Sequence, residues 1–355
     1  MKILIIRLSS IGDCVLSSPV LEALRERYPE AHLTWAVQAK SVPVVRGLPG
    51  LDEVLLWDSK SRENGLKQAL QRTWRERFDI ALDLHGLDKA ALFALASRAK
   101  RRISGTSARF LANRMSNERV DEQEFLHARE FYLRRASLLD IAPDAATRYY
   151  PRVPITDDDR AKATQFLVEN NVEFGAPLLG MNLGASETEK MWPPERYAQL
   201  ANTLLDERPE LRVVVFGAPA DAWLYKRFAI EFNRIRNHAK EMDPRVVSAV
   251  GQLSLMQVAA VSERCSAFIS ADTGPMHIAA AAGAPLLAIF GPTDTRLTAP
   301  VHKPGNLPIR ILDGRDITGS WPASINVWSV ARVLEEVREL MAEVEAARAG
   351  AAIVK

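Results

Sequence analysis

A short segment in the last third of the chain combines residue types that bind phosphate. Residues 270–283 read Ser-Ala-Asp-Thr-Gly-Pro-Met-His-Ile-Ala-Ala-Ala-Ala-Gly, and the apolar run Cys265–Ser270 at their start predicts a short buried strand. Ligands of open α/β sheets bind at the carboxyl ends of strands. A helix N-terminus preceded by glycine offers free N–H groups and the positive end of a dipole. The turn therefore predicts a phosphate site built from Asp272, Thr273, Gly274 and His277.

A second polar turn follows the first apolar run of the chain. Residues 7–19 read Arg-Leu-Ser-Ser-Ile-Gly-Asp-Cys-Val-Leu-Ser-Ser-Pro and hold a single glycine. The G-x-G-x-x-G dinucleotide fingerprint is therefore absent, which argues against a nicotinamide oxidoreductase. What remains at the tip of a predicted strand–loop–helix is the polar set Ser9, Ser10, Gly12 and Asp13. The Asp13 carboxylate stands where a substrate could meet it, or it only caps the following helix.

Two further residues follow predicted strands of the C-terminal half. Lys190 lies between a predicted strand and a helix that starts at Pro194, where its charge could meet a diphosphate. The alternative is a solvated surface lysine. Asp221 follows another strand, and an acidic residue there can hold ribose hydroxyls or favour a helix N-terminus.

The elements that must position these residues alternate between strand and helix. Apolar runs of four to eight residues predict strands, and 3.6-residue periodicity predicts helices. Strands are expected over 3–7, 33–37, 52–57, 80–84, 102–105, 178–183, 212–216, 246–249, 265–270 and 286–290. Helices are expected over 18–27, 42–46, 64–78, 89–99, 125–140, 156–170, 194–207, 221–232, 254–260, 276–282 and 328–347. This rhythm predicts an α/β chain with doubly wound parallel sheets.

The linker-like stretch 149–154 divides the chain into two halves. We expect a Rossmann-like domain over 1–155, a second over 156–327, and a C-terminal helix within 328–355 that packs back on the first domain. Two such halves could hold a donor and an acceptor in the cleft between their facing carboxyl edges.

The composition is that of an ordinary globular enzyme. Apolar residues make up 47% and charged residues 25%, and the net charge is +2, so nothing favours nucleic-acid binding. Two cysteines do not suggest a disulfide framework. No signal-peptide pattern and no apolar run long enough to span a bilayer occur in the sequence. We expect a cytoplasmic protein that can still touch a membrane surface.

Taken together, these motifs resemble those of glycosyltransferase family 9, the ADP-heptose:lipopolysaccharide heptosyltransferases. The resemblance runs from about residue 1 to 345 and is carried, in the family's order, by five blocks: the first strand with Ser-Ser-Ile-Gly-Asp, residues 83–89 (Asp-Leu-His-Gly-Leu-Asp-Lys), residues 190–197 (Lys-Met-Trp-Pro-Pro-Glu-Arg-Tyr), residues 216–219 (Phe-Gly-Ala-Pro), and Asp-Thr-Gly-Pro-Met-His. Residues 290–294 also keep the family's Phe-Gly-Pro-Thr-Asp turn. Within the family, the motifs lead us to expect an enzyme that resembles heptosyltransferase I.

The resemblance implies a GT-B fold, with two Rossmann-like domains facing across a cleft. It also implies an inverting sugar transfer that needs no metal or other cofactor. The donor would be ADP-heptose, and the acceptor an anionic glycolipid of the Kdo-lipid A type at the cytoplasmic face of the inner membrane, where the protein would be peripheral.

The resemblance also assigns roles to residues. Asp13 would be the general base, and Lys190 would support the leaving group. The expected diphosphate contacts are Ser186, Lys190, Thr273, Gly274 and His277. Asp272 would meet the donor sugar, Asp221 the ribose and Leu253 the base. Acceptor contacts are expected from Ser9, Ser10, Gly12, Lys60, Arg62, His85, Lys89, Arg101, Arg102, Arg109, Arg114 and His127.

Some positions depart from the family pattern. Ala185 stands where a second phosphate-contacting hydroxyl often occurs, and the basic cluster over 60–72 is thin for a heavily charged acceptor. A family 9 enzyme with another donor or acceptor is therefore an alternative. A nucleotide-sugar epimerase or a non-catalytic nucleotide-sugar binder of the same architecture are two others.

Overall fold

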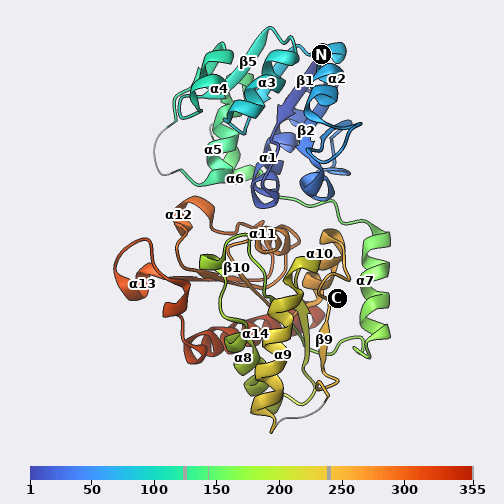
Figure 1. Ribbon diagram of the computed structural model, residues 1–355, viewed down its shortest axis with the longest axis vertical. Helices are drawn as coiled ribbons and strands as arrows, with labels where there is room; N and C mark the ends of the chain where they lie inside the picture. The colour runs from blue at the N-terminus through green and yellow to red at the C-terminus, as the bar shows by residue number, and fades with distance from the viewer. Residues whose placement is uncertain (123–125, 143, 238–240, 354–355) are drawn as a thin grey trace. The chain divides into compact units, whose positions relative to one another are not determined.

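The computed structural model describes residues 1–122, 126–142, 144–237 and 241–353 (Figure 1). The chain divides into two compact units, residues 1–154 and 155–355. This division lies next to the boundary predicted after residue 155. Each unit is described separately below.

The first unit is a six-stranded parallel sheet in the order β3-β2-β1-β4-β5-β6. Its strands are β1 (Lys2–Ile6), β2 (His32–Gln38), β3 (Glu53–Trp57), β4 (Ile80–Asp83), β5 (Arg101–Gly105) and β6 (Glu118–Val120). Its helices are α1 (Ile11–Arg27), η1 (Ala39–Val44), α2 (Leu66–Glu76), α3 (Asp88–Ala96), α4 (Phe110–Met115), α5 (Ala128–Arg135), η2 (Ala136–Leu139) and α6 (Ala145–Arg148). The helix expected over 125–140 is thus α5 followed by η2, and Phe125 lies outside the described residues.

The alternation of side chains along each strand sets which helices cover which face. Leu4 and Ile6 point to one face of the sheet, where they pack with Ala69 of α2 and Phe93 of α3 in a single buried cluster. Successive side chains of a strand point to opposite faces, so Ile3 and Ile5, which are also buried, belong to the other face. Both faces are covered, as expected for a parallel sheet.

Helix α1 begins earlier than the sequence predicted. The expected start was Ser18, but the helix starts at Ile11, so Asp13 lies in its first turn rather than in a loop. Pro19 therefore stands inside the helix, where it has no N–H to offer the carbonyl of Val15. The hydroxyl of Ser18 donates to that carbonyl at 2.7 Å, which satisfies the acceptor that the proline leaves open.

The second unit repeats the first unit's strand order, as β12-β11-β10-β7-β8-β9. Its strands are β7 (Leu178–Asn182), β8 (Arg212–Phe216), β9 (Val246–Ser248), β10 (Ala267–Ala271), β11 (Leu286–Phe290) and β12 (Ile309–Asp313), all parallel. Its helices are α7 (Asp157–Glu169), η3 (Thr188–Lys190), α8 (Pro194–Glu207), η4 (Pro219–Asp221), α9 (Ala222–Ile235), α10 (Leu255–Arg264), α11 (Gly274–Ala281), α12 (Thr295–Thr298), α13 (Arg315–Thr318), η5 (Ile325–Val327) and α14 (Val330–Ile353).

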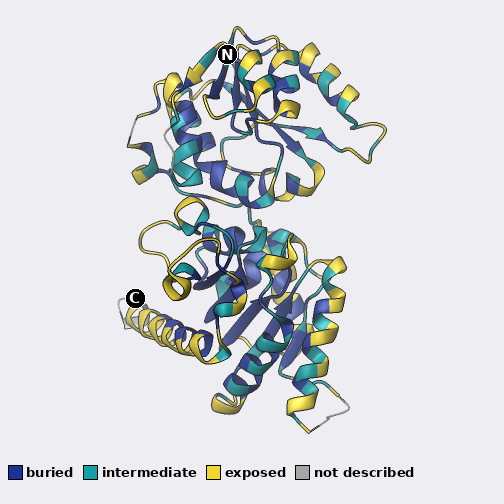
Figure 2. Cartoon of the chain, turned by 60° about the vertical axis from the view of Figure 1, so that its left-hand side comes forward, coloured by how far each residue is buried: buried dark blue, intermediate teal, exposed yellow. Residues whose placement is uncertain are grey.

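The C-terminal helix packs on the second unit, not on the first as expected. Val333, Val337 and Leu340 of α14 are fully buried in a cluster with side chains of α8, α9 and the strands of the second sheet. Helices α7, α10 and α11 cover the opposite face of this sheet. An amphipathic helix goes where an apolar face is uncovered, and α8 and α9 leave room for α14 over the half of the sheet formed by β10 and β11. Figure 2 shows the buried strands of each unit and the exposed outer sides of its helices.

Both sheets place their functional turns at the same topological position. In the first unit β2 and β3 lie on one side of β1, and β4 lies on its other side. In the second unit β8 and β9 lie on one side of β7, and β10 lies on its other side. The crevice outside the carboxyl ends of two such strands is the usual ligand site of open α/β sheets. The turns after β1, β4, β7 and β10 carry most of the predicted site residues.

Candidate active site

Asp13 is held by three partners at the start of α1. Its Oδ2 lies 2.5 Å from Nη2 of Arg7 and accepts hydrogen bonds from the backbone N and the hydroxyl of Ser10 at 3.1 and 2.9 Å. Its Oδ1 accepts a hydrogen bond from the hydroxyl of Tyr132 at 2.7 Å. The side chain is 32% exposed, so a ligand can still reach it. Asp13 therefore caps the helix, as one interpretation held, and also presents a carboxylate at the sheet edge.

These contacts fix the protonation state of the carboxyl group. Burial alone would raise the pKa of Asp13, but the Arg7 guanidinium and the hydrogen bonds from Tyr132 and Ser10 outweigh it and hold the pKa at about 2. Burial raises the pKa of the Tyr132 phenol, so it remains a donor. Asp13 is thus an ionised acceptor of protons at neutral pH.

The turn after β4 places His85 beside this carboxylate. The buried Asp83 accepts hydrogen bonds from the backbone N of His85 and of Gly86, each at 2.8 Å. Burial, and then the charge of Arg7, lower the pKa of His85 to about 4, so its imidazole is neutral at pH 7. Its Nδ1 is buried with no hydrogen-bond partner among the residues that the structure describes. This nitrogen therefore keeps an unused hydrogen-bonding capacity inside the turn.

A buried arginine contacts the turn that carries His85. Arg135 is 2% exposed, and its Nε lies 2.5 Å from Oε1 of Glu122, whose side chain is 1% exposed. Its Nη1 donates to the carbonyl of Asp83 at 2.9 Å. Gly86 has φ +70°, and a Cβ there would lie 3.2 Å from Nη2 of Arg135. The glycine is therefore needed both for its backbone conformation and for the close approach of the guanidinium.

In the second unit, Asp272 joins two of the predicted phosphate-binding residues. Its Oδ2 lies 3.2 Å from Nζ of Lys190, and its Oδ1 lies 3.9 Å from Nε2 of His277. A carboxylate beside phosphates would repel them, but here Lys190 neutralises it and is oriented by it. The side chain of Lys190 remains 20% exposed, so its remaining N–H groups can reach a ligand.

Thr273 and Gly274 stand at the N-terminus of α11, as the sequence predicted. The hydroxyl of Thr273 lies 3.3 Å from Nδ2 of Asn182 and 3.1 Å from the hydroxyl of Ser270, and it makes no capping bond to the helix. The first N–H groups of a helix have no partner within the helix. The N–H of Gly274 is one of these groups and lies at the carboxyl end of β10.

The turns after β7 and β8 meet at Gly184. The Oδ2 of Asp221 accepts a hydrogen bond from the backbone N of Ala218 at 2.7 Å, which is the helix-start role weighed against ribose binding. A Cβ on Gly184 would lie 2.2 Å from this same oxygen, so only glycine fits there. Ser186 is exposed between β7 and η3, and Leu253 packs against the core beneath α7, α10 and α11.

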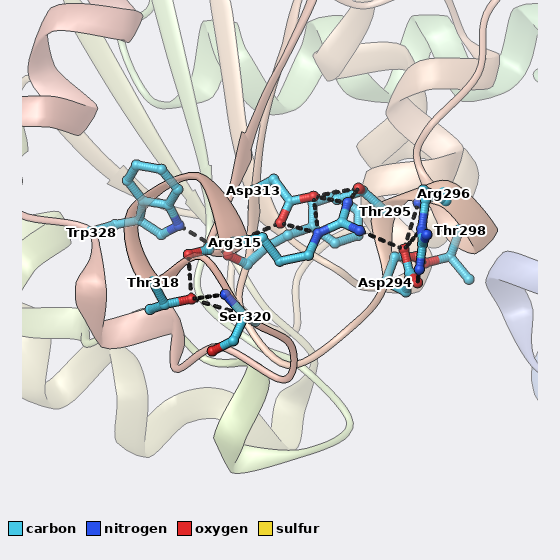
Figure 3. A network of polar contacts seen from close by, with 11 residues as sticks. Asp294, Thr295, Arg296, Thr298, Asp313, Arg315, Thr318, Ser320 and Trp328 are labelled. Atoms are coloured by element: carbon cyan, nitrogen blue, oxygen red, sulfur yellow. Dashed lines mark hydrogen bonds and ion pairs between the residues drawn. The ribbon is translucent and has the colours of Figure 1, made fainter.

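The Phe-Gly-Pro-Thr-Asp turn is tied to the next strand by the polar network of Figure 3. Arg315 pairs with Asp313 and donates from Nη2 to the hydroxyl of Thr295 at 2.7 Å. Its Nη1 lies 3.3 Å from Oδ1 of Asp294. The network fixes the turn after β11 to the turn after β12.

The sequence model of glycosyltransferase family 9 (heptosyltransferase) matches residues 66–307, more than half of the chain. The chain belongs to glycosyltransferase family 9. It is a glycosyltransferase of GT-B fold, as the sequence motifs predicted, and its two Rossmann-like units are those of that fold.

Similar proteins include heptosyltransferases of both types. Lipopolysaccharide heptosyltransferase 2 of Escherichia coli K12 is 26% identical over 98% of this chain and 100% of its own. Lipopolysaccharide heptosyltransferase 1 of the same strain is 26% identical over 84% of this chain and 90% of its own. The solved structure of the E. coli ADP-heptose lipopolysaccharide heptosyltransferase II covers 97% of this chain and 100% of its own with a TM-score of 0.76 at 24% identity. The expected likeness to heptosyltransferase 1 is present, but heptosyltransferase 2 is equally identical, and its alignment covers more of this chain.

Two residues predicted to bind the acceptor of this family 9 enzyme lie at the wrong edge of the sheet. Arg101 and Arg102 begin β5, whereas Asp13 and His85 follow the carboxyl ends of their strands. Arg101 is also held by Glu118 at 2.7 Å, and Arg102 donates to the carbonyl of Met115 at 2.7 Å. Both side chains serve the local structure. Their acceptor role stays a prediction that these positions do not favour, because basic character alone does not show at which end of a strand a residue lies.

Most of the other predicted acceptor residues lie at the carboxyl edge, but Arg114 at the end of α4 is next to Met115, whose carbonyl accepts from Arg102 at the amino edge. Ser9, Ser10 and Gly12 surround the start of α1, and Lys60 and Arg62 follow β3. Lys89 is in the first turn of α3, with its Nζ 5.1 Å from the centroid of the Trp57 ring. The remaining three are Arg109, whose backbone N donates to the carbonyl of Gly86 at 2.9 Å, the exposed Arg114 on α4, and His127, which caps α5.

Three residues of the site were not predicted from the sequence. Tyr132 is 119 residues from Asp13 in the chain, so only the fold shows their contact. The sequence places Arg7 at the end of the first predicted strand. A cation that ends a buried strand usually has a partner, and this signal could have been used. Asn182 ends the fully buried run Leu178–Asn182, and a polar residue in that position was a signal that could have been used.

Replacing Tyr132 by phenylalanine tests the hydrogen bond to Asp13. Because Asp13 has a lowered pKa, its ionisation stabilises the folded chain above its ordinary pKa near 4, and this contribution is lost as the pH falls toward about 2. We expect Tyr132→Phe to lower the free energy of unfolding by about 1.5–3 kcal/mol at pH 7, the range for bonds to charged groups. The loss should shrink below about pH 4, measured by urea unfolding.

Tyr149→Phe is the matched control, since its hydroxyl donates at 2.7 Å to Glu26, whose side chain is 56% exposed. It should cost less than Tyr132→Phe at pH 7. Equal losses in the two variants, or a loss independent of pH, would refute the role given to Tyr132.

Two features are absent from the described residues. No group of three or more His, Cys, Asp or Glu side chains arranged to hold a metal ion occurs among them. None of the helices described is long and apolar enough to cross a membrane.

Proposed function

We propose that this family 9 enzyme transfers heptose from ADP-heptose to an acceptor of the lipopolysaccharide inner core, with inversion at the anomeric carbon. The observation that carries the proposal is the ionised, solvent-reachable carboxylate of Asp13 at the carboxyl edge of the first sheet. Lys190 and the N-terminus of α11 form a cationic counterpart at the same edge of the second sheet. The similar proteins named above, which are lipopolysaccharide heptosyltransferases, support the choice of substrates.

In the proposed reaction a single displacement inverts the sugar. The acceptor hydroxyl oxygen forms a bond to the anomeric carbon as the bond from that carbon to the diphosphate oxygen breaks. Asp13 takes the hydroxyl proton, and ADP leaves with the bonding electron pair. Arg7 and Tyr132 hold the carboxylate in place, so the base is oriented before the acceptor arrives.

The leaving diphosphate gains negative charge, which fixed positive groups can stabilise. Lys190 supplies a cation, Gly274 an N–H at a helix N-terminus, and Thr273 and Ser186 supply hydroxyls. His277 is 6% exposed beside Asp272 and would add a donor. We propose that these groups act without a metal ion.

The remaining assignments concern the two substrates. Asp272 would meet hydroxyls of the donor sugar, Asp221 those of the ribose, and Leu253 the base. Lys60, Arg62, Lys89, Arg109 and Arg114 would attract an anionic acceptor, and the buried Nδ1 of His85 would accept one of its hydroxyls. Such an acceptor is lipid-linked, so we place the reaction at the cytoplasmic face of the inner membrane, with the enzyme peripheral.

Replacing Lys190 by methionine tests the leaving-group site. A hydrogen bond to a charged group contributes about 1.5–3 kcal/mol, so Lys190→Met should weaken ADP binding by about tenfold to a hundredfold in isothermal titration. Lys162→Met, which breaks an exposed lysine–aspartate pair of 2.6 Å on α7, is the matched control and should not change ADP affinity. Unchanged binding by Lys190→Met would remove Lys190 from the site.

The function itself is tested by calorimetric titration with ADP, ADP-heptose and the corresponding uridine and guanosine ligands, followed by a transfer assay. We expect selective binding of the adenine ligands, and heptose transfer that persists when a chelator is added. Preference for another nucleotide would move the enzyme to a different donor. Turnover of the nucleotide sugar without an acceptor would show an epimerase, and strict dependence on a divalent ion would contradict the metal-free mechanism.

A further inference from the structure

The first unit carries a shallow groove that no step of the proposed reaction uses. It is lined by one side of α2 and the end of α3, and its residues are Leu66, Lys67, Leu70, Gln71, Trp74, Arg75 and Ala96. The side of α2 that packs on the sheet is a different one, since Ala69 and Thr73 are its buried residues. The groove is therefore an outer surface of α2 and not part of the core.

Large apolar side chains are exposed around this groove. Trp74 is 54% exposed, and Leu95 of α3 is 50% exposed. Leu66 and Leu70 are only partly covered by the core. Trp74 does not belong to the buried cluster under α2, whereas the adjacent Thr73 is buried. An exposed tryptophan beside leucines marks a surface that meets an apolar environment.

The same surface is cationic. Lys67, Arg75 and Arg98 are exposed, and the Arg98 guanidinium carbon lies 4.7 Å from the centroid of the Trp74 ring. Within the described part of the chain, none of these three cations has a carboxylate within ion-pair distance, and the nearby Glu76 is paired with Lys2 at 2.9 Å. Arginines of other surfaces are paired, for example Arg25 with Asp52 and Arg160 with Glu263. The positive charges of the groove can therefore pair with an anionic partner.

We propose that this groove, which we call the α2 surface, docks the enzyme on a bilayer of anionic phospholipid. Tryptophan is suited to the headgroup layer because its ring is apolar and its N–H is polar. Lysine and arginine place their stems along apolar surface and their charges in water, where anionic headgroups attract them at about 1 kcal/mol each. A surface that combines both is the pattern of a reversible interfacial contact.

The α2 surface also explains how a lipid-linked acceptor could reach the first unit, and this part rests on the proposed function. Helix α2 begins directly after the loop of residues 58–65, which carries Lys60 and Arg62. A membrane bound at α2 would bring anionic headgroups of the acceptor close to that loop. Vesicle binding itself requires no turnover.

Co-sedimentation with vesicles tests the proposal on the full chain. We compare vesicles of phosphatidylcholine alone with vesicles that also contain phosphatidylglycerol. The wild-type protein should bind the anionic vesicles and release them as salt is raised. The variant Trp74→Ser/Arg75→Gln/Arg98→Gln should bind at least tenfold more weakly, since each lost charge removes about 1 kcal/mol.

The second unit offers a matched control. Trp223 on α9 is 47% exposed, and the Arg227 guanidinium carbon lies 5.9 Å from its ring centroid. The variant Trp223→Ser/Lys226→Gln/Arg227→Gln likewise removes one tryptophan and two cations, but from the other unit, and should bind vesicles like the wild type. Circular dichroism of both triple variants establishes that each is folded.

Each other outcome would overturn the proposal. Equal binding to neutral and anionic vesicles would show that binding is not electrostatic. Equal loss of vesicle binding in both triple variants would show that the α2 surface is not the binding site. Concentration-dependent dimerisation in analytical ultracentrifugation, lost in the α2 variant, would assign the surface to a second copy of the chain. Transfer to a detergent-dispersed acceptor should be unchanged in the α2 variant, so failure of vesicle binding and failure of the proposed function are separate results.

Discussion

Replacing Asp13 by asparagine is expected to lower kcat for heptose transfer by about a hundredfold to ten thousandfold, the range contributed by a general base. Asparagine keeps the size of the side chain, and its single amide oxygen can still accept hydrogen bonds from either Ser10 or Tyr132, but it cannot take a proton. ADP affinity should stay within a few-fold, because the proposed donor contacts lie in the second unit. Steady-state kinetics and calorimetry measure the two effects.

The pH dependence of the wild-type enzyme gives a related expectation. Since the pKa of Asp13 is about 2, the carboxylate is ionised well below neutral pH. Any fall in rate between pH 7 and pH 5 must therefore come from another group, and the acid side of the kcat profile should not be that of Asp13.

A stability control is needed, because the same substitution leaves Arg7 without its partner. The Arg7 side chain is 9% exposed, and an unpaired buried charge costs about 3–5 kcal/mol. The double variant Arg7→Met/Asp13→Asn removes both charges and should regain part of that loss. If stability returns and activity does not, the loss of rate is chemical. A double variant that retains more than a tenth of wild-type kcat would exclude Asp13 as the base.

Replacing Arg135 by methionine is expected to have the largest effect on stability. It leaves the carboxylate of Glu122 buried and unpaired, which should cost about 3–5 kcal/mol in the free energy of unfolding. It also removes the hydrogen bond from Nη1 to the carbonyl of Asp83, directly before the His85 turn. We therefore expect a rise in the KM for the acceptor in the protein that remains folded. Urea unfolding and kinetics measure the two effects.

The contrast with an exposed pair makes this prediction specific. Arg148 and Glu26 are 2.6 Å apart, with side chains 47% and 56% exposed, so Arg148→Met should cost far less. The variant Arg135→Met/Glu122→Leu removes both buried charges and should recover much of the stability, since apolar replacement of a buried pair is often neutral. Equal losses for Arg135→Met and Arg148→Met would show that the buried pair has no special role.

The sequence predicted the fold largely because apolar runs and helical periodicity are local signals. Ten of the strands were expected from such runs, but β6 and β12 were missed. β6 has only three residues, Glu118–Val120, and is not apolar throughout. β12 begins Ile-Arg-Ile, and its first three residues are not buried, so neither strand shows the pattern of a buried run.

The site was predictable where a motif lies within one turn, and not where two turns meet. Asp272, Thr273 and His277 come from one segment, and their grouping could be read directly. The contact of Asp13 with Tyr132, and the placement of Arg101 at the amino end of β5, depend on which strands are neighbours. Strand order depends on contacts between residues far apart in the sequence, so it cannot be predicted from the positions of charged residues alone.

The packing of α14 on the second unit has a consequence for how the protein is made. The Trp192 indole donates to the carbonyl of Trp328 at 3.0 Å, and the Trp328 indole donates to the carbonyl of Phe290 at 2.9 Å. The segment leading into α14 thus joins the block after Lys190 to the turn after β11. During translation the first unit can fold while the second is still being synthesised, but the second core stays open until residues 333–344 leave the ribosome. A message cut short before them would therefore yield a folded first unit, which carries Asp13, and a second unit without a complete core.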